Sequence, residues 1–150
     1  MSRSSLALLL VAGLMVVPAG SATANAGGAS AAMVSAINHA RAQHGLPALR
    51  HAPTLSRSST AFARRLMAQN VFGHDNWIHA SSRFTRLGET LSIGRGFRLR
   101  PRLAVRGWLG SPSHRFLLLD RGFRFVGAGP ARGLFSGQRS TLWVAHFGRR

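Results

Sequence analysis

The spacing of apolar residues changes along this chain, and that change constrains the fold more than any other feature of the sequence. Over segments 30–44 and 53–70, apolar residues recur every three or four positions, as on one face of an α-helix. Between residues 123 and 147 they alternate instead, which is typical of strands with one buried face. A helical first half followed by a sheet-forming C-terminal part predicts an α/β fold in which helices cover a sheet.

Proline and glycine mark the boundaries of the expected elements. Gly45 and Pro47 end the first helix, and Pro53 suits the first turn of the second. The other expected elements are a loop over 71–87, a short strand over 90–93, helices over 103–109 and 114–119, and a hairpin whose two strands are joined by a long loop over 130–138. This order predicts a three-layer α-β-α sandwich with a central antiparallel sheet.

The N-terminal segment has the layout of a secretory signal peptide. Arg3 precedes a 12-residue apolar run over 6–17, then Pro18, and small residues follow. An Ala-x-Ala cleavage site ends at Ala24 or at Ala26. The apolar run is shorter than the about 20 residues that span a membrane, so we expect cleavage and export rather than anchoring.

Cleavage would leave one small basic domain. We expect residues 1–26 to be removed, residues 27–33 to form a short lead-in, and a single domain to occupy residues 34–148. Cleavage after Ala26 removes one arginine, so 124 residues of formal charge +16 remain from 150 residues of charge +17. The protein is then secreted, or held in the cell envelope.

The composition excludes several kinds of chemistry. The chain has no cysteine, so disulfides, thiolate nucleophiles and cysteine-ligated metals are excluded. All 20 basic residues are arginine, which excludes a lysine nucleophile. The only acidic residues are Asp75, Glu89 and Asp120, a poor supply for the carboxylate pair of a glycosidase.

Two of the seven histidines stand out as candidates for chemistry. Histidine is the only side chain of this chain that titrates near neutral pH. His74 and His114 lie in segments rich in turn-forming residues and close to the scarce acids. His39, His44 and His51 are expected at the solvated surface.

Glu89 is the only glutamate, and it directly follows a glycine at the start of the expected strand. Either it has a specific functional role, or it pairs with Arg83 or Arg86 beside it. We expect Asp75 to form a turn and Asp120 to pair with a neighbouring arginine at a helix end.

An ordered series of short motifs runs through the chain. It consists of Asn38-x-x-Arg41, Gly45-Leu46-x-x-Leu49, Phe72-x-His74, Gly88-Glu89, Trp108-x-x-Ser111-Pro112-x-His114-Arg115, Val126-Gly127-Ala128-Gly129 and Phe147-Gly148. This series resembles the CAP superfamily, which unites cysteine-rich secretory proteins, antigen 5 and plant pathogenesis-related proteins. The chain is similar to the short, cysteine-free, exported bacterial members. The resemblance covers residues 34–148 and implies an α-β-α sandwich with a central cleft.

The resemblance also implies a cleft with two histidines and two acidic residues. His74, Glu89 and His114 match three of these positions, so we expect them to bind zinc or another divalent metal, with Glu89 also the candidate catalytic base. Glu89 could instead orient a histidine through its second nitrogen. The fourth position, a glutamate in eukaryotic members, is Ser111, three residues after Trp108, and we expect both residues beside the cleft.

The combined observations favour an exported, monomeric binding module over an enzyme, because the second glutamate is missing. Its high charge suits a lipid, a cell-wall polymer or another anionic extracellular ligand, and peripheral contact with anionic membranes, although the arginines could serve solubility alone. The alternative is a metal-dependent, protease-like hydrolase using the same cleft. A Ser-His-Glu triad with Ser111 or Ser113 is disfavoured because no nucleophile-elbow motif is present. Export argues against a nucleic-acid partner.

Overall fold

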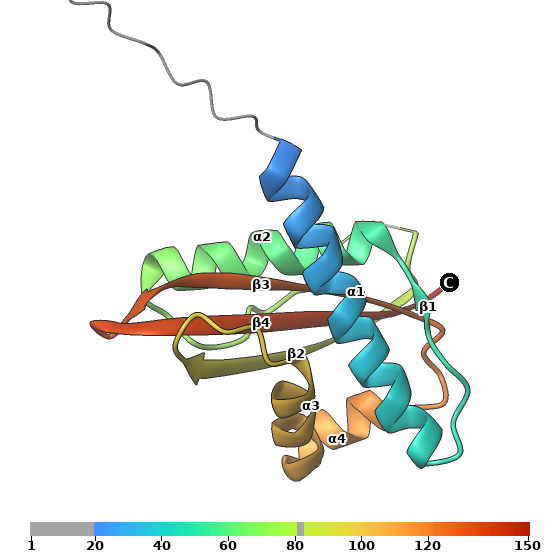
Figure 1. Cartoon of the computed structure of the whole chain (residues 1–150). Helices are drawn as coiled ribbons and strands as arrows, with labels where there is room; N and C mark the ends of the chain where they lie inside the picture. The colour runs from blue at the N-terminus through green and yellow to red at the C-terminus, as the bar shows by residue number, and fades with distance from the viewer. Residues whose placement is uncertain (1–19, 81–82) are drawn as a thin grey trace, which may run out of the picture.

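The computed structural model of the protein describes residues 20–80 and 83–150 (Figure 1). In chain order, the elements are α1 (Gly20–Gln43), β1 (Arg50–His51), α2 (Pro53–Gln69), β2 (Arg86–Arg95), α3 (Pro101–Gly110), α4 (Pro112–Leu119), β3 (Phe125–Phe135) and β4 (Gln138–Arg149). None of the helices over the described residues combines the length and apolarity that crossing a bilayer requires.

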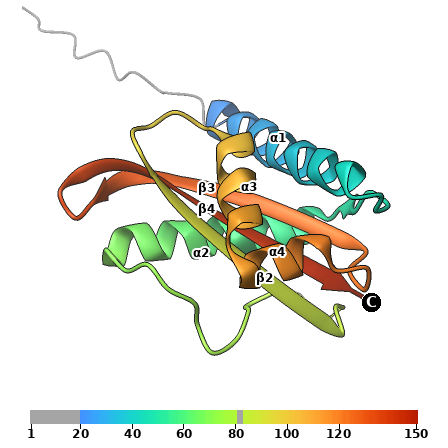
Figure 2. The ribbon, with the colours of Figure 1, turned by 90° about the horizontal axis from the view of Figure 1, so that it is seen from below.

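The elements stack in three layers, which confirms the predicted sandwich. Helix α2 covers one face of the sheet, and α1, α3 and α4 cover the other (Figures 1 and 2). The alternation of β4 divides the core accordingly, because Leu142 and Val144 pack with α2 while Trp143, Ala145 and Phe147 pack with the other helices. The alternating pattern in the C-terminal sequence therefore reports two buried faces rather than one.

The strands lie in the order β1-β3-β4-β2, and β2 forms one edge. Strands β2, β4 and β3 pair antiparallel, as predicted, whereas the two-residue β1 pairs parallel to the start of β3 and makes the sheet mixed. Strand β2 has 10 residues, more than the short strand expected over 90–93.

The prediction of a long loop between the two strands of the hairpin is wrong. Only Ser136 and Gly137 join β3 to β4, and both have positive φ angles, 49° and 75°, as a two-residue hairpin turn requires. Pro130 lies inside β3, opposite Trp143. Proline is tolerated there because β1 pairs with only the first two residues of β3, so the Pro130 nitrogen faces an open edge.

The start of the domain also differs from expectation. Helix α1 begins at Gly20, so Gly27 and Gly28 are helical rather than an unstructured lead-in. Ala29 and Met33 within the expected lead-in belong to the core. Most of the expected signal peptide, residues 1–19, lies outside the described residues, and its cleavage stays a prediction.

Two glycines of β3 allow α2 to lie directly on the sheet. A Cβ atom at Gly127 would lie 2.2 Å from the Ser56 nitrogen, and one at Gly129 would lie 2.0 Å from Thr60 Oγ1. Both distances are far shorter than any van der Waals contact, so no larger residue fits without moving the helix. The close packing fixes where α2 presents its side chains beside the sheet.

Candidate functional site

The candidate site lies along β2, where side chains from both helical layers can meet because this strand is an edge. Glu89 belongs to β2, His74 comes from the loop that follows α2, and His114 comes from α4 in the opposite layer. These three residues are 15 and 25 positions apart in sequence. The fold therefore brings together the three residues predicted as a metal site.

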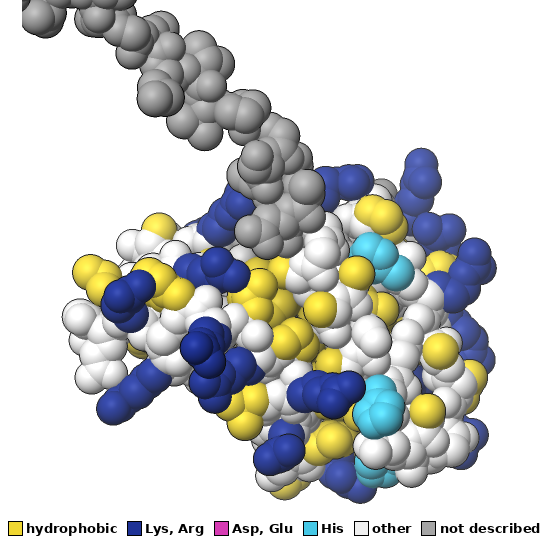
Figure 3. Space-filling view, viewed as in Figure 1, with side chains coloured by type: hydrophobic (Ala, Val, Ile, Leu, Met, Phe, Trp, Pro, Cys, Tyr) yellow, Lys and Arg dark blue, Asp and Glu magenta, His cyan; other side chains and the backbone are white. Residues whose placement is uncertain are grey.

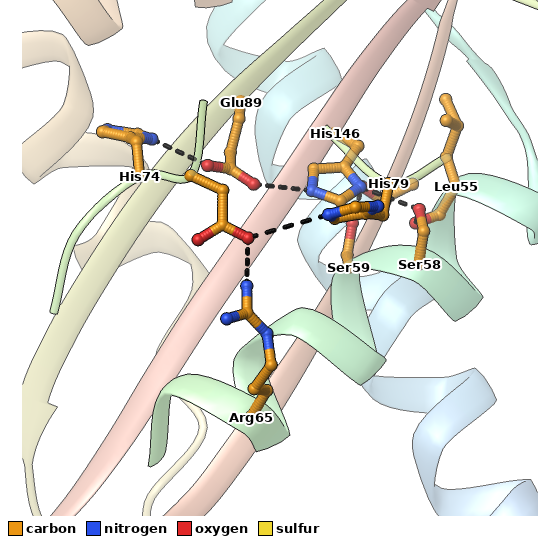
Figure 4. A network of polar contacts seen from close by, with 10 residues as sticks. Leu55, Ser58, Ser59, Arg65, His74, His79, Glu89 and His146 are labelled. Carbon is orange, nitrogen blue, oxygen red and sulfur yellow. Dashed lines mark hydrogen bonds and ion pairs between the residues drawn. The ribbon is translucent and has the colours of Figure 1, made fainter. Parts of the chain in front are cut away.

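Glu89 is the centre of the site and is buried, with only 6% of its side chain exposed. Its Oε1 accepts a hydrogen bond from His74 Nδ1 at 2.7 Å, and its Oε2 accepts one from His146 Nε2 at 2.8 Å (Figure 4). Because a carboxylate only accepts, the two imidazoles supply both protons. Glu89 thus pairs with two histidines, whereas Arg86, one of the arginines considered as its partner, pairs with Asp120.

His146 belongs to the candidate site through its bond to Glu89, and the sequence analysis did not identify it. It lies on β4 directly opposite Glu89, is 1% exposed, and is joined through Nδ1 to Ser58 Oγ at 2.8 Å. Figure 4 shows Ser58, His146, Glu89 and His74 joined in one chain of hydrogen bonds that runs from α2 to the cleft. Only the register between β2 and β4 identifies this histidine, and that register is not visible in sequence.

His114 faces His74 across the cleft. Their ring centroids are 6.0 Å apart and their planes differ by 55°. Burial lowers the pKa of His114 below its ordinary value, and the neighbouring His74 lowers it further. The His114 imidazole is therefore neutral, with a free lone pair, over a wider pH range than an exposed histidine.

The two histidines line a hollow of about 660 Å³, which we call the cleft. Its lining includes His74, Asp75, Trp77, Glu89, Ser113 and His114. A second hollow of about 200 Å³ lies on the α2 side of Glu89 and shares Trp77 with the cleft. Glu89 therefore separates two spaces, one in front of His74 and one in front of His146.

The two residues expected as neighbours of the cleft do not line it directly. Trp108 is 1% exposed within the core, and its indole nitrogen donates to the Leu91 carbonyl at 2.7 Å. Ser111 does not line the cleft, whereas Ser113 does. The Ser111 hydroxyl lies 3.4 Å from the Ser113 hydroxyl, so it is one residue removed from the cleft.

The other two acids have structural partners. Asp75 forms an ion pair with Arg65 of α2, which holds the loop carrying His74 against that helix. Asp120 pairs with Arg86 rather than with an arginine adjacent in sequence. Burial opposes ionisation of Asp120, but the Gly122 N–H and Arg86 outweigh it and lower the pKa of that carboxyl.

The donor set limits how a metal could be held. Over residues 20–80 and 83–150, no three His, Asp or Glu side chains are grouped in a way that holds a metal ion. Each oxygen of Glu89 already accepts a hydrogen bond from a histidine, which fixes the orientation of the carboxylate. The residues fit a site in which His74 and His114 are the protein ligands and Glu89 orients His74 from behind.

The fold and this site define a class of protein, an α-β-α domain whose edge-strand glutamate and two histidines line a cleft. A model of the cysteine-rich secretory protein family, CAP, matches residues 34–147. The chain belongs to the CAP family. Comparison with curated proteins gave no match.

Solved structures of low sequence identity share the fold. An outer surface protein from Borrelia burgdorferi is 22% identical, with a TM-score of 0.63 over 79% of this chain and 90% of the other. An extracellular protein with an SCP domain from Bacillus anthracis is 20% identical, with a TM-score of 0.69 over 90% of this chain and 45% of the other. A cysteine-rich secretory protein from Staphylococcus aureus is 16% identical, with a TM-score of 0.58 over 83% and 39%. This chain spans less than half the length of the last two proteins.

Proposed function

We propose that this chain is an exported CAP domain that works as a binding module, with a divalent cation held in the cleft by His74 and His114. The observation that carries the proposal is the bond from His74 Nδ1 to Glu89, with His114 facing His74 at 6.0 Å between ring centroids. Export is supported by the signal-peptide layout and by structural neighbours that are named as outer-surface or extracellular proteins.

The bond to Glu89 prepares His74 for a metal. With Nδ1 protonated and donating to the carboxylate, the lone pair on Nε2 is the free one, and the carboxylate makes the ring more basic. Half of the His74 side chain is exposed, so a cation can reach it from the cleft. Two imidazoles suit zinc and leave its remaining coordination positions to water or to oxygen atoms of a ligand.

Binding is favoured over hydrolysis by the state of Glu89. A general base must reach the proton that it abstracts, and the Glu89 side chain is only 6% exposed, with each oxygen directed at a histidine. Asp75, the other acid that lines the cleft, is paired with Arg65. The two bonds to histidines support a role for Glu89 in orienting these rings, which favours binding over the protease-like alternative.

Zinc titration by calorimetry tests the cleft. We expect His74→Ala and His114→Ala each to weaken zinc binding by at least about tenfold, because each removes one of two protein ligands, a loss above 1.4 kcal/mol. The exposed His39 is the matched control, and His39→Ala should leave affinity unchanged. Equal affinity in the wild type and the His74→Ala/His114→Ala double variant would refute the site.

The orienting role of Glu89 has its own test. Glu89→Gln keeps the shape and one acceptor oxygen but removes the charge, so we expect zinc affinity to fall by about 10- to 100-fold, as for other partners of metal-bound histidines. Circular dichroism of the variant checks that it is folded. An unchanged zinc affinity in a folded Glu89→Gln protein would show that Glu89 does not act on His74.

The surface charge adds a second part to the proposal, namely contact with anionic ligands of the cell envelope, either lipids or polymers. Such contact should weaken steeply with salt, because binding releases counterions from the polyanion. Retention on heparin or teichoic-acid matrices measures this, and weak retention at low salt would leave solubility as the only role of the arginines.

A further inference from the structure

Two hollows flank the first turn of α3, and exposed arginines line both of them. One hollow, of about 610 Å³, lies between α1 and α3, and the other, of about 480 Å³, lies between α3 and the end of β2. They share Arg100, Leu103 and Arg106. We call the two hollows together the arginine groove, whose basic residues are Arg95, Arg98, Arg100, Arg102 and Arg106.

The charge of the arginine groove is uncompensated. No acidic residue lines either hollow, and no ion pair joins a groove arginine to a carboxylate among the described residues. The three acids of the chain lie elsewhere, in the cleft and after α4. Figure 3 shows the face that carries α1 and α3 with arginines around exposed apolar side chains and no acidic side chain in view.

This clustering disfavours the folded state of the protein alone. Arg102 and Arg106 are four positions apart on α3, a like-charge spacing that destabilises a helix by about 0.2–0.5 kcal/mol. An anion bound between the arginines would remove that repulsion. Solubility alone does not require the arginines to line the same concave surface.

The backbone on both sides of the connection that carries Arg98 and Arg100 is held by secondary structure. Arg95 is the last residue of β2 and pairs with Ser140 of β4. Gly96 follows, and its N–H donates to the Arg139 carbonyl at 2.6 Å. The Gly96 carbonyl accepts a hydrogen bond from Thr141 Oγ1 at 2.8 Å. Helix α3 then starts at Pro101. These anchored ends limit how much backbone binding has to order, which lowers its entropic cost.

We propose that the arginine groove binds a phosphodiester polymer, a chain of phosphate esters separated by short uncharged units. Guanidinium groups pair with phosphate oxygens through two parallel hydrogen bonds, which favours phosphate among anions. Leu103, which is 53% exposed and lines both hollows, and Ile93, which lines one of them, offer apolar contact to the units between phosphates. Two joined hollows suit a chain that enters them, whereas a flat membrane surface would contact the protruding parts of the molecule.

This inference rests on the part of the proposed function that concerns anionic ligands of the surface, and names their chemical class. It does not depend on a metal in the cleft.

The test measures binding of a fluorescein-labelled synthetic poly(glycerol phosphate) chain by fluorescence anisotropy across a salt series. The variant is Arg100→Gln/Arg106→Gln, which changes both hollows. The matched control is Arg57→Gln/Arg64→Gln, which removes the same charge from exposed positions on α2, across the sheet. Anionic phospholipid vesicles serve as a second probe.

We expect the groove variant to bind the polymer at least about tenfold more weakly than the wild type, and its log–log salt slope to be smaller by about 1 to 2. The α2 control should stay within about twofold of the wild type, since only long-range charge is lost. Equal weakening in both variants would overturn the arginine groove while sparing the general anionic surface. Wild-type binding to vesicles but not to the polymer would overturn the polymer as ligand, and no binding to either probe at low salt would overturn the anionic surface as well.

Discussion

Asn38 and Arg41, the two residues of the Asn38-x-x-Arg41 motif, hold the fold together and do not line the cleft. The Asn38 side chain donates to the Leu49 carbonyl at 3.0 Å and accepts from the Leu49 N–H at 2.8 Å. Arg41 is fully buried and donates to the carbonyls of Pro47, Leu118 and Asp120. The guanidinium thereby ties α1 to the connection after it and to the end of α4.

Arg41→Met should destabilise the protein strongly. The substitution keeps much of the volume but leaves three carbonyls without their charged donor, and we expect a loss of about 2–4 kcal/mol in the free energy of unfolding. Urea unfolding measures this loss, with the exposed Arg106→Gln as the control. A loss of less than about 0.5 kcal/mol would show that water replaces the guanidinium without cost.

The pKa of His114 predicts how stability depends on pH. Because burial and His74 lower this pKa in the folded state, the unfolded chain binds more protons as the pH falls below 6.5, the ordinary value. Stability should therefore decrease through this range, down to the folded pKa. His114→Gln should reduce the drop in Tm between about pH 7.5 and pH 5. An unchanged pH dependence in this variant would show that other groups cause it.

The sequence predicts single residues unevenly. His74, Glu89 and His114 follow from the motif resemblance, because their neighbours in sequence carry the pattern. His146 does not, because it lies between apolar residues of β4 and becomes important only through its register opposite Glu89. Trp108 shows the reverse case, since its position in the motif reflects packing in the core rather than the cleft.

At the scale of elements, the helices were predictable and the sheet was less so. The buried positions Leu55, Ser59, Phe62 and Leu66 of α2 follow the helical period directly. A strand of two residues such as β1 is too short to show a periodicity. Pro130 led to the prediction of a loop within β3, because the open edge that tolerates a proline there is a property of the whole sheet and cannot be seen in the local sequence. Local signals thus predict helices, whereas strand lengths depend on partners far away in sequence.

The close packing of α2 on β3 gives a prediction at this scale. Gly129→Ala should destabilise the protein by about 1–3 kcal/mol, because its Cβ would meet Thr60 Oγ1 at 2.0 Å and push the helix away. Gly94→Ala in β2 is the matched control, since nothing lies within 4 Å of a Cβ there. Thermal unfolding compares the two variants. Equal Tm values would mean that α2 moves freely on the sheet.

At the scale of the whole molecule, the edge position of β2 explains why the site exists where it does. Only at an edge can α4 from one layer and the loop after α2 from the other reach the same glutamate. The arginine groove lies at the other end of the same strand and includes Arg95. The order β1-β3-β4-β2 that creates this edge comes from long-range pairing, so the sequence predicted the members of the site but not the reason that they meet.

The last prediction concerns export, and the packing of α1 limits how much of the N-terminal segment can be removed without loss of stability. We expect the mature protein to begin at Asn25 or Gly27, which N-terminal sequencing of the exported protein would show. Intact Met1 in a membrane fraction would contradict cleavage. Gly27 and Gly28 are exposed, and Ala29 is the first buried residue of the core among the residues whose burial is described. Cleavage before Gly27 therefore removes no core contact known from the structure.

The same limits can be tested on purified chains. A chain starting at Gly27 should unfold at the same temperature as one starting at Asn25. A chain starting at Val34 loses the fully buried Met33 and the bond from Ser30 to Ser56, and should be less stable by about 2–5 kcal/mol, the usual cost of removing one large core side chain. If the Val34 chain were equally stable, residues 27–33 would be the dispensable lead-in that the sequence suggested, and the packing of α1 before Val34 would contribute nothing to the fold.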